Sequence, residues 1–374
     1  MSWKEVTIMS QRVEFLNLAL QDDSNISELC RRFKISRKTG YKFLKRYKAE
    51  GFEGLYDRPR KPINSPKRTD KGIEKLILTL REKHPSWGGR KLKRRLEDLG
   101  HSNIPSPSTI TAILQRHDKI SIQESLKRQA LVRFCAERPN DLWQMDFKGQ
   151  FQARDGTCHP LTILDDHSRF SLCIAACRDH RKETVKEKLE EVFSLYGMPL
   201  AMLVDNGSPW GDHADSVHTK LTVWLMRLEI RVIHSRPYHP QTLGKEERFH
   251  RTLKQDVIKD CHDRTINECQ GLFDQWRKVY NLERPHQALD MQVPSKHYTM
   301  SHRPFPESLP EIEYHDIDAV RKVQSLGKIS FKNKEYKVGR AFIGQRVAVR
   351  PTNKNNVFDV FFMNHKIKQI MTTK

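Results

Sequence analysis

Leu142-Trp143-Gln144-Met145-Asp146-Phe147 is the stretch that decides the fold, because an apolar run typical of a buried strand carries a carboxylate. The strand predicted from it covers residues 142–151. Residues 160–165 and 170–177 form two more apolar runs bounded by turn residues, a pattern typical of β-strands. The region therefore begins with three successive strands, which we expect to be antiparallel.

Helices and strands alternate after these three strands. Residues 184–196 repeat apolar side chains at helical spacing, and residues 200–204 predict a fourth strand that ends at Asp205. Residues 221–228 predict a helix and residues 231–234 a short fifth strand. This order predicts a central α/β domain over residues 137–300, with a mixed five-stranded sheet and helices on its faces.

Two further acidic positions accompany Asp146, one at the end of a predicted strand and one at the start of a predicted helix. Asp205 ends a predicted strand in Leu203-Val204-Asp205-Asn206-Gly207-Ser208, and Glu246 and Glu247 open a predicted helix after Gly244-Lys245. Helical geometry alone does not separate the two glutamates, because both lie in the first turn. Carboxylates that converge from strands and a helix suit Mg²⁺, which prefers oxygen ligands and keeps positions open for water and phosphate.

The charge of the chain favours a polyanionic partner. Its 374 residues hold 67 Lys and Arg against 46 Asp and Glu, a formal net charge of +21. Residues 31–71 contain 15 basic and 4 acidic residues, whereas residues 137–215 contain 9 basic and 14 acidic ones. A basic binding region beside an acidic core explains this contrast better than a uniform surface effect. Together with the three acids, it points to metal-assisted phosphoryl transfer on nucleic acid.

The cysteines indicate a reducing compartment. Seven are scattered without a C-x-x-C pair, and Cys173 and Cys177 lie in an apolar run where buried packing is favoured over metal binding. No signal peptide and no apolar run of about 20 residues is evident. We expect a cytoplasmic, nucleoid-associated protein.

The N-terminal region, residues 1–55, predicts a helix-turn-helix domain. Asn25 and Ser27 offer caps for a short helix, Lys34-Ile35-Ser36 makes a tight turn, and Ser36 can cap a basic helix that ends at Glu50. A three-helix protein-binding module with a solvated basic face is the alternative. The candidate DNA contacts on the third helix are Arg37, Lys38, Lys42, Lys45 and Arg46.

Residues 56–68 are basic and rich in proline, and predict an extended linker that either follows phosphates or is merely solvated. Residues 69–120 predict a second helix-turn-helix domain. Its basic cluster comprises Arg90, Lys91, Lys93, Arg94 and Arg95, of which Arg90, Lys91 and Arg94 are the chosen candidate DNA contacts. Two tandem units would recognise a longer DNA site than one.

The C-terminal region, residues 315–374, predicts a small all-β module. Short strands alternate there with turn residues, which favours a barrel of the SH3-like kind. The predicted strands are 328–331, 335–338, 346–350, 357–363 and 366–370.

Five motifs occur in an order that resembles the DDE transposases of bacterial insertion sequences, within the retroviral-integrase superfamily. The resemblance covers residues 137–294. The motifs are Trp143-Gln144-Met145-Asp146, Leu164-Asp165-Asp166-His167-Ser168-Arg169, Asp205-Asn206-Gly207-Ser208, Tyr238-His239-Pro240-Gln241-Thr242 with Gly244-Lys245-Glu246-Glu247-Arg248-Phe249-His250-Arg251, and Asn281-Leu282-Glu283-Arg284-Pro285-His286-Gln287-Ala288-Leu289.

The resemblance implies an RNase H-like core with Asp146 on the central strand, Asp205 after a neighbouring strand and the third acid on a helix. The family pattern of Gly-Lys, any residue, then Glu-Arg selects Glu247 as that acid. Asp146 would bridge two Mg²⁺ ions, which Mn²⁺ can replace, and Asp205 and Glu247 would each hold one. The paired His and paired Cys of the retroviral zinc site have no counterpart here, so we expect no zinc.

The implied reaction has two steps at one site. Water cleaves a phosphodiester at the end of the element, and the 3′-hydroxyl so freed attacks target DNA. The implied partners are double-stranded DNA, at the element ends and the target, and a second copy of the chain, since two ends must be held together. Asn206, Ser208, His239, Gln241, Lys245, Arg248 and His250 either contact phosphates or support the site, and Lys245 and Arg248 are the chosen DNA contacts.

Further expectations concern three residues beside the site and two alternative functions of the whole protein. Asp165 and Asp166 are expected to serve a turn after a strand, and His286 to cap or anchor a helix. A repressor with an inactive core and a metal-dependent nuclease that does not join DNA are the alternative functions.

Overall fold

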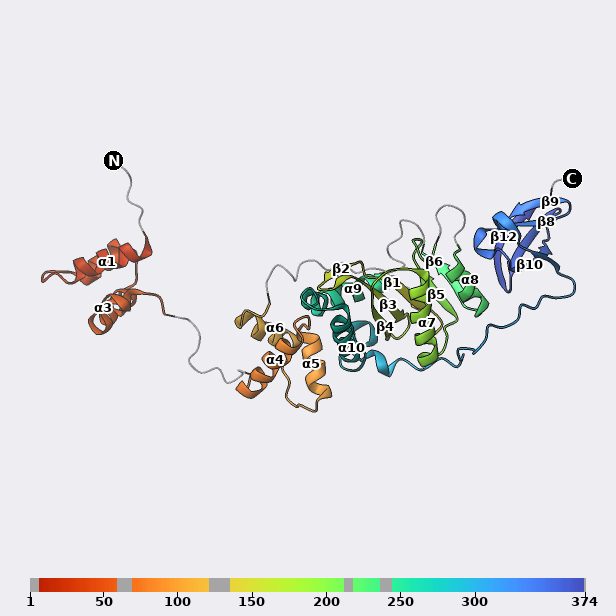
Figure 1. Cartoon of the computed structure of the whole chain (residues 1–374). Coiled ribbons are helices and arrows are strands. Elements are labelled where there is room, and N and C mark those ends of the chain that lie inside the picture. The colour runs from red at the N-terminus through yellow and green to blue at the C-terminus, as the bar shows by residue number, and fades with distance from the viewer. Residues whose placement is uncertain (1–6, 59–68, 121–134, 212–217, 236–243, 373–374) are drawn as a thin grey trace. The chain divides into compact units, whose positions relative to one another are not determined.

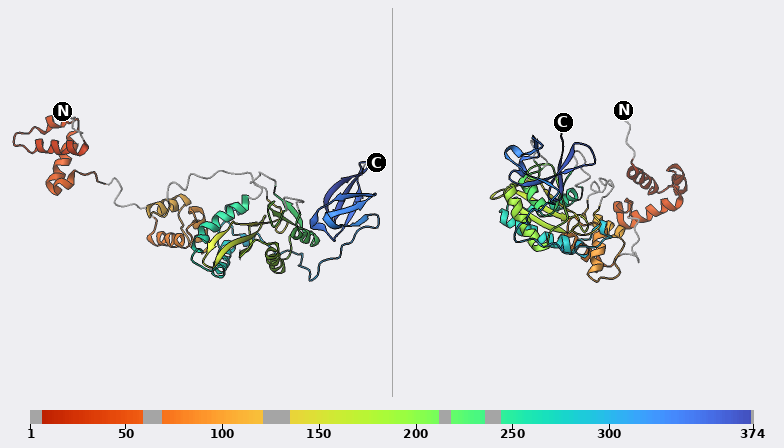
Figure 2. Two further views of the ribbon diagram at one scale, coloured as in Figure 1. Left: turned by 45° about the horizontal axis from the view of Figure 1, so that its top comes forward. Right: turned by 90° about the vertical axis from the view of Figure 1, so that its right-hand side faces the viewer.

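The computed structural model describes residues 7–58, 69–120, 135–211, 218–235 and 244–372. The chain divides into two compact units, residues 1–68 and 69–374. The predicted linker falls at this division, and its residues 59–68 lie outside the described part, as does the motif of residues 238–242. Figures 1 and 2 show the elements of each unit.

Three helices form the N-terminal unit, namely α1 (Ile8–Ala19), α2 (Ile26–Arg32) and α3 (Arg37–Glu50). The predicted caps are confirmed at two positions: the Asn25 side chain accepts from the first turn of α2, and the Ser36 side chain accepts from the backbone of Thr39. Lys34 takes the left-handed conformation in the turn between α2 and α3. The helix, turn and basic helix expected from the sequence are therefore present.

The three helices pack tightly around one small core that includes Phe15, Cys30 and Phe43. Gly40 of α3 is the point of closest approach. A Cβ atom there would lie 2.6 Å from the Cys30 sulfur and 3.0 Å from the Phe15 ring. This contact between α2 and α3 fixes the angle at which the basic helix leaves the turn.

The second unit begins with three more helices, α4 (Lys71–Lys83), α5 (Gly89–Asp98) and α6 (Pro107–Arg116). The apolar side chains Ile77, Leu92, Leu96 and Ile110 are almost wholly buried between them. Pro107 opens α6, where a proline costs no hydrogen bond. These helices occupy the region predicted for the second helix-turn-helix domain.

The central sheet contains six described strands rather than the five predicted. They are β1 (Trp143–Phe147), β2 (Phe151–Ala153), β3 (Gly156–Asp165), β4 (Ser171–Cys177), β5 (Ala201–Val204) and β6 (Arg231–His234). The predicted strand 142–151 is split into β1 and the start of β2, because Gly149 adopts a left-handed φ of 88° that interrupts the pleat.

The sheet is mixed, as expected. Its strands run in the order β4, β3, β1, β5, β6, with β2 beside the other end of β3. The first three pair antiparallel, whereas β1 with β5 and β5 with β6 pair parallel. This arrangement puts β1 in the middle of the sheet, with an antiparallel neighbour on one side and a parallel neighbour on the other.

Helices cover both faces of the sheet (Figure 1). Trp143 and Met145 face α7 (Lys182–Tyr196) and α8 (Lys220–Arg227) in one apolar cluster. The other face packs against α9 (Gly244–Asp256) and α10 (Ile266–Leu282), through residues such as Phe249 and Phe273. Side chains alternate along a strand, so Gln144 and Asp146 are directed to the α9 face.

The C-terminal region is all-β, but no closed barrel is found among its described residues. The strands β7 (Ala319–Lys322), β10 (Arg346–Pro351), β11 (Val357–Phe362) and β12 (His365–Met371) form one antiparallel sheet, and β8 (Lys328–Phe331) and β9 (Lys334–Lys337) form another. The prediction of an SH3-like barrel is therefore not confirmed. The sequence did not indicate β7, whose residues Ala319-Val320-Arg321-Lys322 place two apolar side chains before two basic ones and so lack the alternation typical of a strand.

Candidate active site

Asp146 lies on β1 with its side chain directed to α9. It is opposite Thr162 of β3 in the antiparallel register, and its side chain is 26% exposed. Burial and, second, the negative charge of Asp205 raise the pKa of Asp146 from 3.8 to about 7. A carboxyl group in this setting would be stabilised by a cation placed beside it.

Asp205 follows β5 directly and lies next to Asp146. The parallel register pairs Trp143 with Met202 and Gln144 with Leu203, and Asp146 and Asp205 each come two residues further along. The backbone N–H of Gly207 donates to Asp205 Oδ1 at 3.1 Å, which orients the carboxylate. The structure thus brings together the first two predicted acids, at the shared edge where two parallel strands end.

Glu246 is the glutamate of α9 that faces the sheet. Its side chain is fully buried, and its Oε2 accepts a hydrogen bond of 3.0 Å from the Thr162 hydroxyl. His250 Nε2 lies 3.4 Å from the same oxygen. Burial and, second, the charge of Asp146 raise the pKa of Glu246 well above its usual range.

Glu247 points away from the sheet. Its side chain is 66% exposed, and its Oε1 lies 3.2 Å from Arg251 Nη2, one turn further along α9. Successive residues of a helix point about 100° apart, so the two glutamates cannot occupy the same position. The structure therefore places Glu246, and not the predicted Glu247, beside Asp146. Within the described residues, no three acidic, histidine or cysteine side chains are gathered closely enough to hold a metal ion as they stand.

His250 is the third polar side chain under Asp146. Its Nε2 lies 2.8 Å from the Thr162 hydroxyl and its Nδ1 lies 3.9 Å from Asp146 Oδ2. Burial lowers the pKa of His250 to about 3, with a smaller contribution from Lys148. His250 is therefore neutral near neutral pH and supports the site by hydrogen bonding.

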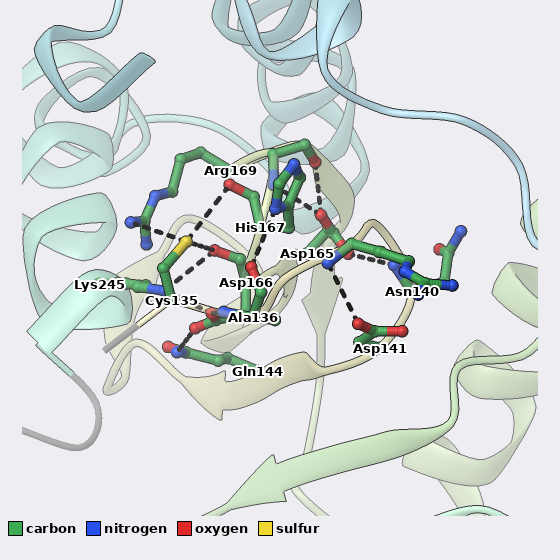
Figure 3. A network of polar contacts seen from close by, with 12 residues as sticks. Cys135, Ala136, Asn140, Asp141, Gln144, Asp165, Asp166, His167, Arg169 and Lys245 are labelled. Carbon is green, nitrogen blue, oxygen red and sulfur yellow. Dashed lines mark hydrogen bonds and ion pairs between the residues drawn. The ribbon is translucent and has the colours of Figure 1, made fainter. Parts of the chain in front are cut away.

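The turn after β3 holds two fully buried carboxylates, shown in Figure 3. Asp165 accepts from the backbone of Asn140 and from the backbone and hydroxyl of Ser168, at 2.5 to 2.8 Å. This agrees with the expected turn. Asp166 has a different role, because it accepts from Gln144 of β1 at 2.6 Å and pairs with Lys245 of α9 at 2.5 Å.

The predicted DNA contacts of α3 lie on its outer face. Arg37, Lys38, Lys42 and Lys45 are exposed, and Arg46 is half-buried. The Lys42 ammonium stands 4.5 Å from the centre of the Phe43 ring, and Lys42 remains exposed to solvent. DNA binding by this basic face stays a prediction.

The other predicted DNA contacts differ in their surroundings. Arg90 is exposed, whereas Arg94 pairs with Asp98 at 3.0 Å within α5. Lys91 is half-buried and Arg248 is exposed. Lys245 is directed inward, with only 14% of its side chain exposed. A contact between Lys245 and a phosphate is thus not available in this arrangement.

The mixed sheet with adjacent acids at the ends of its parallel strands defines the class of integrase-like cores. Family models agree along the chain. Residues 136–240 and 228–294 each match an integrase core domain, and residues 318–374 match the C-terminal domain of IS481 family transposases. Residues 11–63 match a helix-turn-helix domain, and residues 39–114 a homeodomain-like domain.

Two of the curated relatives come from insertion elements. An uncharacterized 39.2 kDa protein of insertion element IS476 from Xanthomonas euvesicatoria is 24% identical over 250 residues, 65% of this chain and 68% of the relative. An uncharacterized 31.7 kDa protein of IS407 from Burkholderia multivorans is 22% identical, over 64% of this chain and 84% of the relative. Among solved structures, the HTLV-2 integrase catalytic core domain in complex with magnesium is 14% identical, covers 44% of this chain and 99% of its own, and superposes with a TM-score of 0.35.

The integrase core domains, the IS481 C-terminal domain and the insertion-element relatives support a DDE transposase of a bacterial insertion sequence, within the retroviral-integrase superfamily. The chain is an enzyme of the polynucleotidyl-transferase type. No helix in the described part of the chain is long and apolar enough to cross a membrane.

Proposed function

We propose that this protein binds the ends of an insertion sequence, hydrolyses the end phosphodiester to free a 3′-hydroxyl, and joins that hydroxyl to target DNA. The observation that carries the proposal is that Asp146 and Asp205 lie next to each other. Burial and, second, the negative charge of Asp205 raise the pKa of Asp146 to about 7. Two carboxylates kept close together at the rim of a sheet are a costly arrangement unless a cation joins them.

The donor set fits hard divalent cations. Both side chains offer oxygen, which Mg²⁺ and Mn²⁺ prefer over nitrogen or sulfur. Asp146, Asp205 and a glutamate from the first turn of α9 would hold two ions. When bound, such ions stabilise charge on the scissile phosphate and lower the pKa of the attacking water.

We propose Glu247 as the glutamate that completes the set. A ligand in a phosphoryl-transfer site must be ionised and within reach of substrate. The carboxyl group of Glu246 is fully buried against Thr162, and its raised pKa favours the neutral form. Among the described residues, Glu247 forms an exposed ion pair with Arg251, and pairs of that kind are worth about 0–1 kcal/mol. Breaking this pair therefore adds little to the cost of a rotamer change toward the site.

The chain's own residues then have separate tasks. Gly207 fixes the direction of the Asp205 carboxylate through its backbone N–H. Thr162 and the neutral His250 are buried between the sheet and α9 and link the two beneath Asp146. The reaction needs no covalent protein intermediate, because water and then the DNA 3′-hydroxyl serve as nucleophiles.

We propose that α3 delivers the element end. Its exposed basic side chains suit the major groove and the flanking phosphates, as the second helix of a helix-turn-helix does. The α5 face contributes less direct charge, because Arg94 is engaged by Asp98 and Arg95 pairs with Glu283 at 2.8 Å.

The test is an in vitro reaction with labelled element ends and a plasmid target. Joined products in Mg²⁺ or Mn²⁺ support transposition, cleavage alone supports a nuclease, and binding without either supports a repressor. Asp146→Asn should abolish cleavage and joining while the affinity for end DNA stays the same. Joining by that variant would overturn the site.

A further inference from the structure

A buried ion pair joins the first turn of α9 to the turn after β3. Lys245 Nζ lies 2.5 Å from Asp166 Oδ2 and donates to the Asp166 carbonyl at 3.0 Å. The Asp166 side chain is fully buried and that of Lys245 is 14% exposed. The pair spans 79 residues of sequence, so it is a tertiary contact rather than a feature of one turn.

The same carboxylate also reaches the central strand. Gln144 Nε2 donates to Asp166 Oδ1 at 2.6 Å, and the backbone N–H of Ala136 donates to Oδ2 at 2.6 Å. Gln144 lies two residues before Asp146, on the same face of β1. Asp166 is therefore a joint between the strand that carries Asp146 and the helix that carries the glutamates, and Figure 3 shows the contacts around it.

The contacts of Asp166 bear on both glutamates of α9 because of where Lys245 lies in the sequence. Lys245 directly precedes Glu246 and Glu247, so any rotation of the first turn of α9 moves both glutamates. A lysine aimed at phosphate would extend into solvent, whereas this ammonium is enclosed by Asp166 and its carbonyl. Burial and the neighbouring Arg169 lower the pKa of Lys245, and Asp166 acts in the opposite direction.

We propose that Lys245 and Asp166 are positioning residues whose ion pair fixes the first turn of α9, and with it the glutamate of the metal site, against the strand of Asp146. This inference rests on the proposed function for its link to metal binding. It replaces the prediction that Lys245 contacts DNA. Supporting residues of a metal site typically change metal affinity by about 10–100-fold when they are removed.

The experiment uses full-length Lys245→Met, which removes the charge and keeps much of the length. Hydrogen exchange of the amides of residues 248–252, which close the first turn of α9, should become at least about tenfold faster. The concentration of Mn²⁺ that gives half-maximal end cleavage should rise at least about tenfold. The affinity for end DNA and its salt dependence should not change. Lys259→Met, which alters an exposed lysine just beyond α9, is the matched control and should match the wild type in every measurement.

Asp166→Asn is the second variant, because it keeps the side-chain size and removes the charge. It should shift exchange and metal dependence in the same direction as Lys245→Met. The double variant should be no worse than the more severe single one, since the two substitutions remove one interaction. If Lys245→Met fails to give the circular dichroism of the wild type, Asp166→Asn and Lys245→Arg carry the test.

Two results would overturn the inference. One is unchanged exchange and unchanged metal dependence in both single variants. The other is a loss of DNA affinity with a shallower salt dependence in Lys245→Met, as expected of a phosphate contact. Failure of the proposed function is distinguishable, because the wild type and Asp146→Asn would then be equally inactive while hydrogen exchange still reported on the joint.

Discussion

The raised pKa of Asp146 should make the free energy of unfolding of the metal-free protein depend on pH. This pKa is raised from 3.8 to about 7, so the folded state holds a proton that the unfolded state releases between these values. The free energy of unfolding therefore falls as pH rises through this window. Asp146→Asn should be more stable than the wild type at pH 8, and the difference should be about 2–3 kcal/mol larger there than at pH 5. Urea unfolding at the two pH values in a chelator measures it.

Added Mg²⁺ provides the control for this prediction. Ions that bind the folded state raise the stability of the wild type at pH 8 in proportion to the logarithm of their concentration. Asp146→Asn should gain much less, since it lacks one carboxylate. An equal gain in both proteins would mean that the ions bind elsewhere.

Exchange of the two glutamates tests the third ligand. Glu247→Gln should lower end cleavage by at least about 100-fold, because the side chain stops being an anion. Glu246→Gln keeps a hydrogen-bond acceptor for Thr162 and should lower it by about tenfold at most. Single-turnover rates in Mg²⁺ give the comparison, and the reverse order would assign the third ligand to Glu246.

The sequence could predict that Asp146 and Asp205 lie together, because each position is defined by one strand. Asp146 interrupts the apolar run of β1, and Asp205 follows the end of β5, so their adjacency depends only on the two strands pairing in parallel. The third acid depends on the rotational phase of α9, where a shift of one residue exchanges the buried and exposed glutamates. Asp166 with Lys245 could not be predicted, because nothing local signals a contact across 79 residues.

Two glycines within helices, Gly40 of α3 and Gly271 of α10, predict opposite effects on stability when alanine replaces them. Gly40→Ala would put a Cβ atom 2.6 Å from the Cys30 sulfur, and overpacking of this kind costs about 1–3 kcal/mol. Gly271→Ala meets nothing within 4 Å, and alanine gains about 1 kcal/mol over glycine inside a helix. Hydrogen exchange should be faster in α1 to α3 for the first variant and slower in α10 for the second. Protection of α3 in Gly40→Ala equal to that of the wild type would show that Cys30 can move aside.

The helices were predictable to within a few residues because caps and apolar spacing are local signals. The predicted third helix, which runs from the Ser36 cap to Glu50, matches α3. Strands depend on their neighbours, which explains the errors among them. The left-handed Gly149 divides one predicted strand, and β7 exists only because β10 pairs with it. Whether the C-terminal strands close into a barrel depends on pairing between sheets, which strand patterns do not specify.

Across the whole chain, charge and assembly are linked. The formal net charge of +21 makes free copies repel one another at low salt, whereas the phosphates of bound DNA neutralise that charge and release counterions. Two element ends must be held together for joining, so we propose that DNA drives dimer formation. Sedimentation at about 0.01 M salt, where the Debye length is about 30 Å and the repulsion is little screened, should show single chains without DNA. Particles of two chains with two end duplexes should appear when DNA is added. Duplexes of unrelated sequence serve as the control, because they neutralise charge without pairing the ends. A dimer that is stable without DNA would show that contacts between the chains determine assembly. A dimer that unrelated duplexes form equally well would show that neutralisation of charge is sufficient and that the element ends are not required.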